Sequence, residues 1–207
     1  MKIKVIVYGI LTGGILLLFS SCIGIEASII LDSGGSGKIE LSYQISQLVM
    51  NLGKLEKEDN FVPLPVSQAD FAKTVEKIEG LSVNQVGVIE NEDNVIVTAS
   101  LNFKTMSALS ALLSLEGKNS VTLSDSNGNS IFRYQIAVAD QAPSEDSLRM
   151  AEVFFEGYKL AFTLKTPRQI AKTNIGNVDP DGRTVHFSIS MVELIQLKDG
   201  LTWEVIF

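Results

Sequence analysis

The sequence predicts an α+β fold: a mainly antiparallel sheet with helices packed on one of its faces. Three observations predict it. Several segments alternate apolar and polar residues with a period of two, as strands with one solvated face do. Turn dipeptides such as Asn127-Gly128 join strands by connections that are too short for parallel pairing. Helical patterns follow the strand pairs, and these helices would cover one face of the sheet.

The first half of the chain contains patterns for strands and helices in turn. Lys38–Ser46 alternates strictly, so it predicts a strand with one apolar face. Ser67, with Asp70 three residues later, is typical of a helix start, and Gly80 is typical of a helix end. The expected elements are strands at Glu26–Leu31 and Lys38–Ser46, helices at Leu48–Leu55 and from Ser67 to Gly80, strands at Leu81–Glu90 and Asn94–Phe103, and a helix at Thr105–Leu115.

The second half is richer in strands. Asn127-Gly128 predicts a tight hairpin, and the Asp181-Gly182 and Asp199-Gly200 pairs predict two further turns. The expected elements are hairpin strands at Val121–Ser124 and Ile131–Val138, a helix from Ser144 to Phe155, alternating strands at Tyr158–Leu164 and Val185–Met191, and a last strand at Leu201–Phe207.

The amino terminus is expected to be a signal peptide at residues 1–21. Lys2 and Lys4 form a short basic region, and the uncharged, largely apolar stretch Val5–Phe19 follows it. This order of a basic region, an apolar region and small residues is that of a secretory signal, which is removed from the mature protein. Fold arguments therefore start after it, and residues 22–207 are expected to form one extracytoplasmic domain.

Small residues precede the only cysteine of the chain. Ser20 and Ser21 supply the small side chains that a signal peptidase requires before its cut, and Cys22 follows them. This segment resembles the lipobox of bacterial lipoproteins, although Phe19 stands where an aliphatic residue is usual. The resemblance implies cleavage before Cys22 and a diacylglyceryl lipid on its thiol, which would anchor the protein to the cell membrane or the outer membrane.

An uncleaved membrane span is the alternative for the same segment. The uncharged run continues to Ile25, and about 20 apolar residues are enough to cross a bilayer. The two amino-terminal lysines would then keep that end in the cytoplasm. Both alternatives place the residues beyond Ile25 outside the cytoplasm.

The charge balance excludes some partners. The chain has 17 basic and 24 acidic residues, and the signal peptide contains two of the basic ones, so the mature chain carries a net charge of −9. An acidic domain repels phosphate backbones and anionic lipid headgroups. We therefore expect no nucleic-acid partner. With Cys22 lipidated, no thiol remains for a disulfide, so the domain must be stabilised by burial.

Catalytic, phosphate-binding and metal motifs are not predicted. His186 is the only histidine and lies between Val185 and Phe187, so we expect it on the polar face of a strand. The loop Gly34–Lys38 lacks the first glycine and the Ser or Thr of a phosphate loop, and it joins two strands. Asp125–Asn129 lacks the glycine and glutamate positions of a calcium loop. The sequence thus predicts neither an enzyme nor a cofactor or metal.

An apolar helix is the best candidate for a binding site. The segment Met106–Leu115 contains no charge and is apolar on nearly all sides. A helix buried in the core explains this composition. A helix with one side against a hydrophobic ligand or a membrane explains it too, because ligand sites are mostly apolar. The residues expected to line such a site are Met106, Leu109, Leu112, Leu113, Phe154 and Phe162.

The carboxyl-terminal third resembles a known family. Its pattern is Pro167, Ile170, Asn174 and Gly176, then Asp181–Phe187, and finally Trp203. This resembles the closing pattern of the LppM-like bacterial lipoproteins, in which a proline, an asparagine near a glycine and a G-x-T-V-x-W strand follow one another. Gly37–Leu41 is similar to the opening strand of that family. Arg168 and Phe187 depart from the pattern, which often has Gly and Trp there. The resemblance implies an envelope lipoprotein with an α+β domain and a tie to envelope lipids.

Together these observations predict a lipid-anchored envelope protein that acts by binding. The expected partner is a hydrophobic or lipid-like ligand, and the membrane is contacted through the lipid on Cys22. The alternative is a structural or protein-interaction module of the envelope without a small-molecule ligand.

Overall fold

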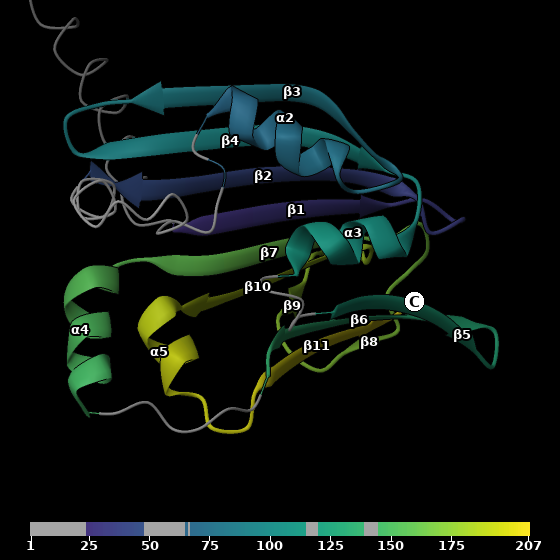
Figure 1. The fold of residues 1–207 in the computed structure, drawn as a ribbon. Coiled ribbons are helices and arrows are strands. Elements are labelled where there is room, and N and C mark those ends of the chain that lie inside the picture. Colours follow the sequence, from purple (N-terminus) through teal and green to yellow (C-terminus); the bar gives the residue numbers. More distant parts are fainter. Residues whose placement is uncertain (1–23, 48–64, 66, 115–119, 139–144) are drawn as a thin grey trace, which may run out of the picture.

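The chain folds into two β-sheets around a shared set of buried apolar side chains, as seen in the computed structural model (Figure 1). The structure describes residues 24–47, 65, 67–114, 120–138 and 145–207. Cys22 and the helix expected at Leu48–Leu55 lie outside these residues. The predicted fold class is confirmed: it is α+β, and every pairing among the described strands is antiparallel except one.

The larger sheet has the described strand order β3-β4-β2-β1-β7-β10-β9. Its strands are β1 (Ile25–Leu31), β2 (Gly37–Ser46), β3 (Leu81–Glu90), β4 (Asn94–Phe103), β7 (Lys159–Lys165), β9 (Asn177–Val178) and β10 (Thr184–Ser190). The parallel pair is β1 with β7, in which Ala27 lies opposite Phe162. The chain between these two strands is long, and parallel strands require such a long connection.

The smaller sheet has the described order β5-β6-β11-β8. Its strands are β5 (Ser120–Ser126), β6 (Asn129–Ala137), β8 (Lys172–Thr173) and β11 (Leu201–Ile206). Asn127 and Gly128 form the predicted turn between β5 and β6, with φ angles of 51° and 83°. Two positive φ angles suit a type I′ turn, whose twist matches that of a hairpin.

The described helices are α2 (Gln68–Glu76), α3 (Met106–Leu113), α4 (Glu145–Phe155) and α5 (Met191–Gln196). The helix α2 packs on β3, and α3 packs on β5 and β4, so both lie over one side of the larger sheet (Figure 1). Ser67 and Thr105 cap these two helices, because each hydroxyl accepts a hydrogen bond from a backbone N–H in the first turn. The helices α4 and α5 pack together at the end of the sheet where β1 begins (Figure 1).

The boundary between β10 and α5 differs from the prediction. The alternation of apolar residues predicts that the strand runs to Met191, but β10 ends at Ser190 and α5 begins at Met191. Ser190 and Glu193 form a capping box: the Ser190 hydroxyl accepts from the Glu193 N–H, and the Glu193 carboxylate accepts from the Ser190 N–H, each at 3.1 Å. The first apolar residue of the helix continues the alternation of the strand, so periodicity alone does not locate this boundary.

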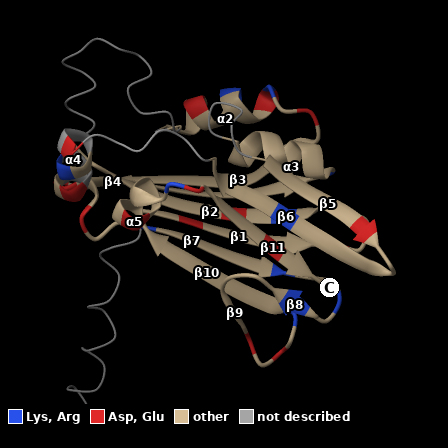
Figure 2. Cartoon of the chain, turned by 90° about the horizontal axis from the view of Figure 1, so that it is seen from below, with Lys and Arg blue, Asp and Glu red and all other residues tan. Residues whose placement is uncertain are grey.

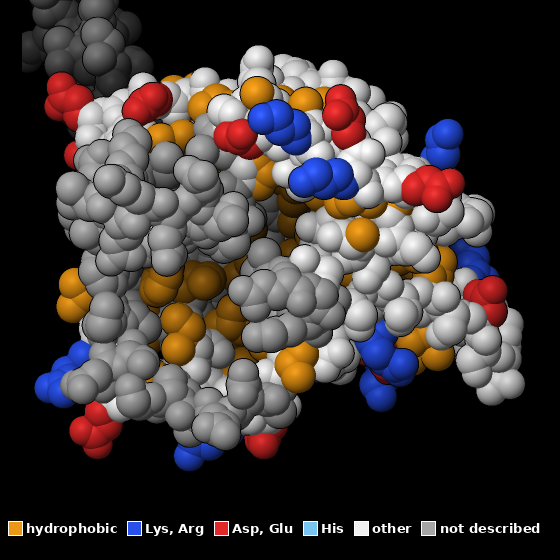
Figure 3. Space-filling view, in the orientation of Figure 1, with side chains coloured by type: hydrophobic (Ala, Val, Ile, Leu, Met, Phe, Trp, Pro, Cys, Tyr) orange, Lys and Arg blue, Asp and Glu red, His pale blue; other side chains and the backbone are white. Residues whose placement is uncertain are grey.

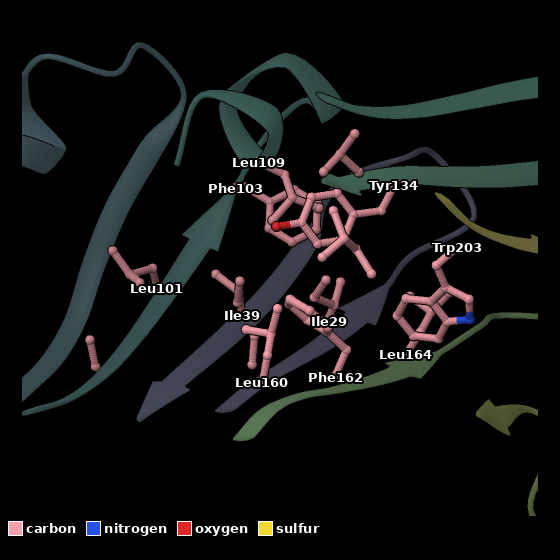
Figure 4. Close-up of a cluster of buried hydrophobic side chains, with 14 of the residues drawn as sticks. Ile29, Ile39, Leu101, Phe103, Leu109, Tyr134, Leu160, Phe162, Leu164 and Trp203 are labelled. Atoms are coloured by element: carbon pink, nitrogen blue, oxygen red, sulfur yellow. The ribbon is translucent and has the colours of Figure 1, made fainter. Parts of the chain in front are cut away.

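The two faces of the larger sheet differ in burial. The inner face points toward α2, α3 and the smaller sheet, and its apolar side chains form most of the core (Figure 4). The outer face points to solvent and bears mostly polar side chains. The buried inner-face side chains include Ala27, Ile29, Ile39, Tyr43, Val97, Leu101, Phe162, Leu164 and Val185.

Candidate functional site

The outer face of the larger sheet is polar and open. Ser28 lies opposite Glu40, and Glu26 lies opposite Ser42, on the antiparallel strands β1 and β2. Because most side chains here are short, the surface is hollowed into a depression of about 380 Å³. Among the described residues, no group of three or more His, Cys, Asp or Glu side chains is placed to hold a metal ion. The face therefore offers hydroxyl groups and separate carboxylates to solvent.

His186 lies on this outer face, as its position between two apolar residues predicts. Its Nε2 is 2.9 Å from Oδ2 of Asp179, and its Nδ1 is 2.9 Å from Oγ1 of Thr163. The carboxylate only accepts, so Nε2 donates to it, and Nδ1 forms the second hydrogen bond with the threonine hydroxyl. Both ring nitrogens are thus engaged, and the three side chains form a hydrogen-bonded chain along the sheet surface.

An aromatic cluster joins the two sheets on the inner side. The ring of Tyr134 meets Phe162 edge to face, with centroids 5.1 Å apart. Trp203 lies 6.0 Å from Phe132, 6.1 Å from Phe162 and 6.2 Å from Phe187 between ring centroids. The Nε1 of Trp203 is buried and has no hydrogen-bond partner among the described residues. Leaving such a donor unsatisfied costs about 1–3 kcal/mol.

The structure separates the residues that the sequence groups as a ligand site. Leu109 and Phe162 are fully enclosed in the core. Leu112 and Leu113 are half-buried at the carboxyl-terminal end of α3. Met106 is half-buried at the other end of that helix, where its Cγ would lie 3.8 Å from a Cβ placed on Gly35. These two ends of α3 are about 10 Å apart, given a rise of about 1.5 Å per residue.

Two further predicted residues cannot be placed in this set. The backbone of Phe154 belongs to α4, but its side chain is outside the described atoms, as are those of Asp146, Ser147, Met150 and Ala151. Cys22 is outside the described residues as well. The assignment of a ligand to the six residues, and of a lipid to the cysteine, therefore stays a prediction.

An apolar hollow opens beside the carboxyl-terminal end of α3. Figure 3 shows hydrophobic side chains gathered in the hollowed front of the molecule, over the region between α2, α3 and α5. Half-buried apolar side chains that pack against the core on α3 and on the neighbouring elements are Leu112 and Leu113 of α3, Phe187 and Ile189 of β10, and Met191 and Leu194 of α5. We call these six residues the apolar hollow.

Contacts within the core connect the two sides of this hollow. The hydroxyl of Tyr134 donates to the carbonyl oxygen of Leu113 at 3.4 Å, and its ring packs on Phe162. Phe162 pairs with Phe187 across the strands β7 and β10. A chain of ring contacts therefore links the carboxyl-terminal end of α3 to β10 through the core.

Four residues of the hollow were not predicted from the sequence. Phe187 and Ile189 alternate with polar residues and look like ordinary core positions of a strand. Met191 continues that alternation, and Leu194 follows a helix start that the strand pattern conceals. A signal was present, since Ser190 and Glu193 have the spacing of a capping box.

Two ionisable groups of this part of the chain have shifted pKa values, Glu193 on α5 and Tyr43 on β2. Glu193 is fully exposed, and its pKa is lowered first by the hydrogen bond from the Ser190 hydroxyl and then by the Ser190 N–H. Tyr43 lies deeper on the inner face, where burial raises the pKa of its phenol and its hydroxyl donates to the carbonyl oxygen of Pro65. The interior of this side is thus apolar, and the charged groups stand outside it.

None of the helices in the described part of the chain combines the length and the apolar character that a membrane crossing requires. No protein-family model and no curated protein matches this sequence. Among solved structures, the chain is similar to the NMR structure of the folded domain of the LppM protein from Mycobacterium tuberculosis, with a TM-score of 0.46 and 16% sequence identity over 89% of this chain and 88% of that one.

Proposed function

We propose that this chain is a cell-envelope lipoprotein, anchored through Cys22, whose domain binds an apolar or lipid-like ligand in the apolar hollow without catalysing a reaction. The observation that supports this is the half-exposure of apolar side chains in a concave part of the molecule (Figure 3). Burying apolar surface lowers the free energy by about 25 cal/mol per Å² removed from water. Binding of an apolar ligand that covers the hollow is therefore favourable.

The shape of the site also favours a binder. Ligand sites are concave and mostly apolar, with few polar groups. Here Phe187 packs against Trp203, whose ring also packs on Phe162, so the floor of the hollow is fixed. A fixed apolar floor loses little entropy when a ligand binds.

The polar groups of the outer face support the non-catalytic part of the proposal. His186 would be the natural general base, but its nitrogens are engaged by Thr163 and Asp179 on an open surface. General bases act on a substrate proton within hydrogen-bonding reach, normally inside a cleft. Nothing in this arrangement leaves a ring nitrogen directed at a bound substrate.

The experiment is to purify the chain from its bacterial membrane and to record native mass spectra in detergent. We expect a stoichiometric lipid-sized adduct. We also expect the fluorescent fatty acid cis-parinarate to bind and to accept excitation energy from Trp203. The ring centroid of Trp203 lies 6.2 Å from that of Phe187, which is a residue of the hollow. The variant Leu112→Asn should lower both signals while its circular dichroism stays unchanged.

The control is Val178→Asn, on the far strand β9, where the side chain is 41% exposed. This variant should keep both signals. A protein without adduct that also fails to bind cis-parinarate would refute a ligand site in the apolar hollow. Equal loss of both signals in Leu112→Asn and Val178→Asn would show that an added polar side chain weakens binding wherever it stands, and not because it lies in the hollow.

A protein-interaction module is the second candidate, and the edge strand β3 favours it. This strand lies at the edge of the larger sheet, is ten residues long and contains neither Lys nor Pro. Val83 and Ile89 on it are 40% and 64% exposed. Exposed apolar edge strands are templates for pairing with another chain. If no ligand is found, loss of a co-purifying envelope protein on changing Val83 to Lys would support this function.

A further inference from the structure

Exposed apolar side chains gather at one end of the larger sheet. This proximal end consists of Gly24, the turn Glu90–Asn94, α4 and α5. Val153 on α4 is 77% exposed, Phe155 is 38% exposed, and Ile89 beside the turn is 64% exposed. Single exposed apolar residues are common, but several large ones at one end of a domain indicate a contact surface.

Backbone hydrogen bonds hold these elements together at the proximal end. The N–H of Gly24 donates to the carbonyl oxygen of Lys159 at 3.1 Å, and the carbonyl oxygen of Gly24 accepts from Gln44 at 3.0 Å. The N–H of Tyr158 donates to Phe155, and the N–H of Met191 donates to Tyr158. The end of α4 and the start of α5 therefore lie directly beside the point where the chain enters the sheet.

The distance from the sheet to the anchor is short. Gly24 is fixed in the sheet, and Cys22 stands only two residues before it. Two extended residues span at most roughly 7 Å. The headgroup layer of a bilayer is about 5–8 Å thick on each side of the hydrocarbon core. A lipid on Cys22 would thus hold the proximal end against the membrane surface.

The charge of the proximal end limits which lipids it meets. Acidic side chains dominate α4, as Figure 2 shows. Glu152 and Glu156 flank the exposed apolar positions, and Arg149 is the one basic residue of that helix. Anionic headgroups would repel these carboxylates. The surface suits zwitterionic headgroups, with the apolar side chains supplying the attraction.

We propose that the proximal end lies on the bilayer that holds the lipid of Cys22, with Val153, Phe155 and Ile89 in its headgroup layer. This inference rests on the lipid anchor of the proposed function. It places α5, which lines the apolar hollow, next to the same bilayer. A lipid-like ligand would then enter the hollow from the membrane without crossing water.

The experiment places a tryptophan at each end of the sheet. Val153→Trp and Phe155→Trp mark the proximal end, and Val178→Trp on β9 is the matched control at the far end. The full chain is expressed in a bacterial host, purified from its membrane and reconstituted into phosphatidylcholine vesicles with brominated acyl chains. Bromine quenches only indoles that reach the lipid, and the buried Trp203 gives every variant the same background.

We expect strong quenching by the brominated lipid in Val153→Trp and Phe155→Trp, and no more quenching than in the parent in Val178→Trp. Equal quenching at both ends, or none at either, overturns the proposal. If Cys22 is found with a free thiol, the native anchor fails, and the same thiol is then coupled to a maleimide lipid, so the orientation is still measured. Ligand binding is tested separately by the mass of the adduct. If no ligand is found, the orientation measured by quenching still stands.

Discussion

The ring of Tyr134 on the smaller sheet meets the ring of Phe162 on the larger sheet at 89°, with centroids 5.1 Å apart. The Tyr134 hydroxyl also donates to the carbonyl oxygen of Leu113 at the end of α3. One residue pair therefore joins both sheets and orients the helix that borders the apolar hollow. Phe162 was predicted from the sequence as a ligand contact, and the structure places it beneath the hollow as a core residue.

Phe162→Ala should be strongly destabilising. Its ring is buried and contacts both Tyr134 and Trp203, so truncation leaves a cavity between the sheets. We expect a loss of about 3–5 kcal/mol in the free energy of unfolding, measured by urea denaturation. The exposed Phe155 is the control, and Phe155→Ala should change that free energy by about 0.5 kcal/mol or less. Similar losses in both variants would contradict the position assigned to Phe162.

Gly37→Ala should disrupt the hairpin of β1 and β2. A Cβ at Gly37 would lie 2.0 Å from the carbonyl oxygen of Ile30 and 2.8 Å from Cζ of Phe103. The backbone atom cannot move away without breaking the strand pair, so we expect a loss of about 3 kcal/mol or more. Gly34→Ala in the same turn is the control, because no atom of the described residues lies within 4 Å of a Cβ placed there. Thermal unfolding of both variants compares them, and a stable Gly37→Ala protein would refute this packing.

Local features of the sequence were enough to locate most elements. The strands predicted at Leu81–Glu90 and Asn94–Phe103 have those bounds in the structure. Their alternation gives one face apolar character, and the polar turn between them leaves only a short connection. The helix start at Ser67 was also predicted, since its side chain caps the nearby N–H groups. These features depend on residues close together in sequence.

Long-range pairing could not be predicted in the same way. The strand β1 lies between β2 and β7, and Ala27 pairs with Phe162 across more than half of the chain. Periodicity gives the exposed and buried faces of each strand but contains no information about which strands meet. The division into two sheets, and with it the position of Phe187 in the hollow, depends on that choice of partner.

Leu109 and Leu112 should respond differently to truncation, although the sequence assigns both to one site. Leu109 is fully buried against the core, so Leu109→Ala should cost about 2–5 kcal/mol in unfolding free energy. Leu112 is half-buried in the apolar hollow, so Leu112→Ala should cost clearly less and should weaken cis-parinarate binding. Urea denaturation and the fluorescence titration measure the two effects. Equal destabilisation would place Leu112 in the core instead.

Asp181 should give the protein a pH-dependent stability at acid pH. Its pKa is lowered first by the hydrogen bond from the Arg183 N–H and then by that from the Thr184 hydroxyl. A carboxyl whose pKa is lower in the folded state stabilises that state above its unfolded pKa, and this stabilisation is lost as the pH falls through the folded value. Asp181→Asn should therefore lower the urea midpoint at pH 7.

That difference from the parent should vanish as the pH falls below about 4, the range in which free aspartates titrate. Asp199→Asn, at another Asp-Gly turn, is the control for removing one negative charge. Urea midpoints across this pH range are the measurement. A constant difference between Asp181→Asn and the parent would show that the lowered pKa does not contribute to stability.

Ser190→Ala should loosen α5 and, through it, one wall of the apolar hollow. The Ser190 hydroxyl accepts from the Glu193 N–H, and Glu193 accepts in return from the Ser190 N–H. Removing such a cap costs about 0.5–2 kcal/mol, and a helix of six residues has few other interactions of its own. We expect faster amide exchange at Leu194 and weaker cis-parinarate binding. Ser190→Thr keeps the hydroxyl and should retain both; if Ser190→Ala binds as tightly as the parent, α5 does not shape the site.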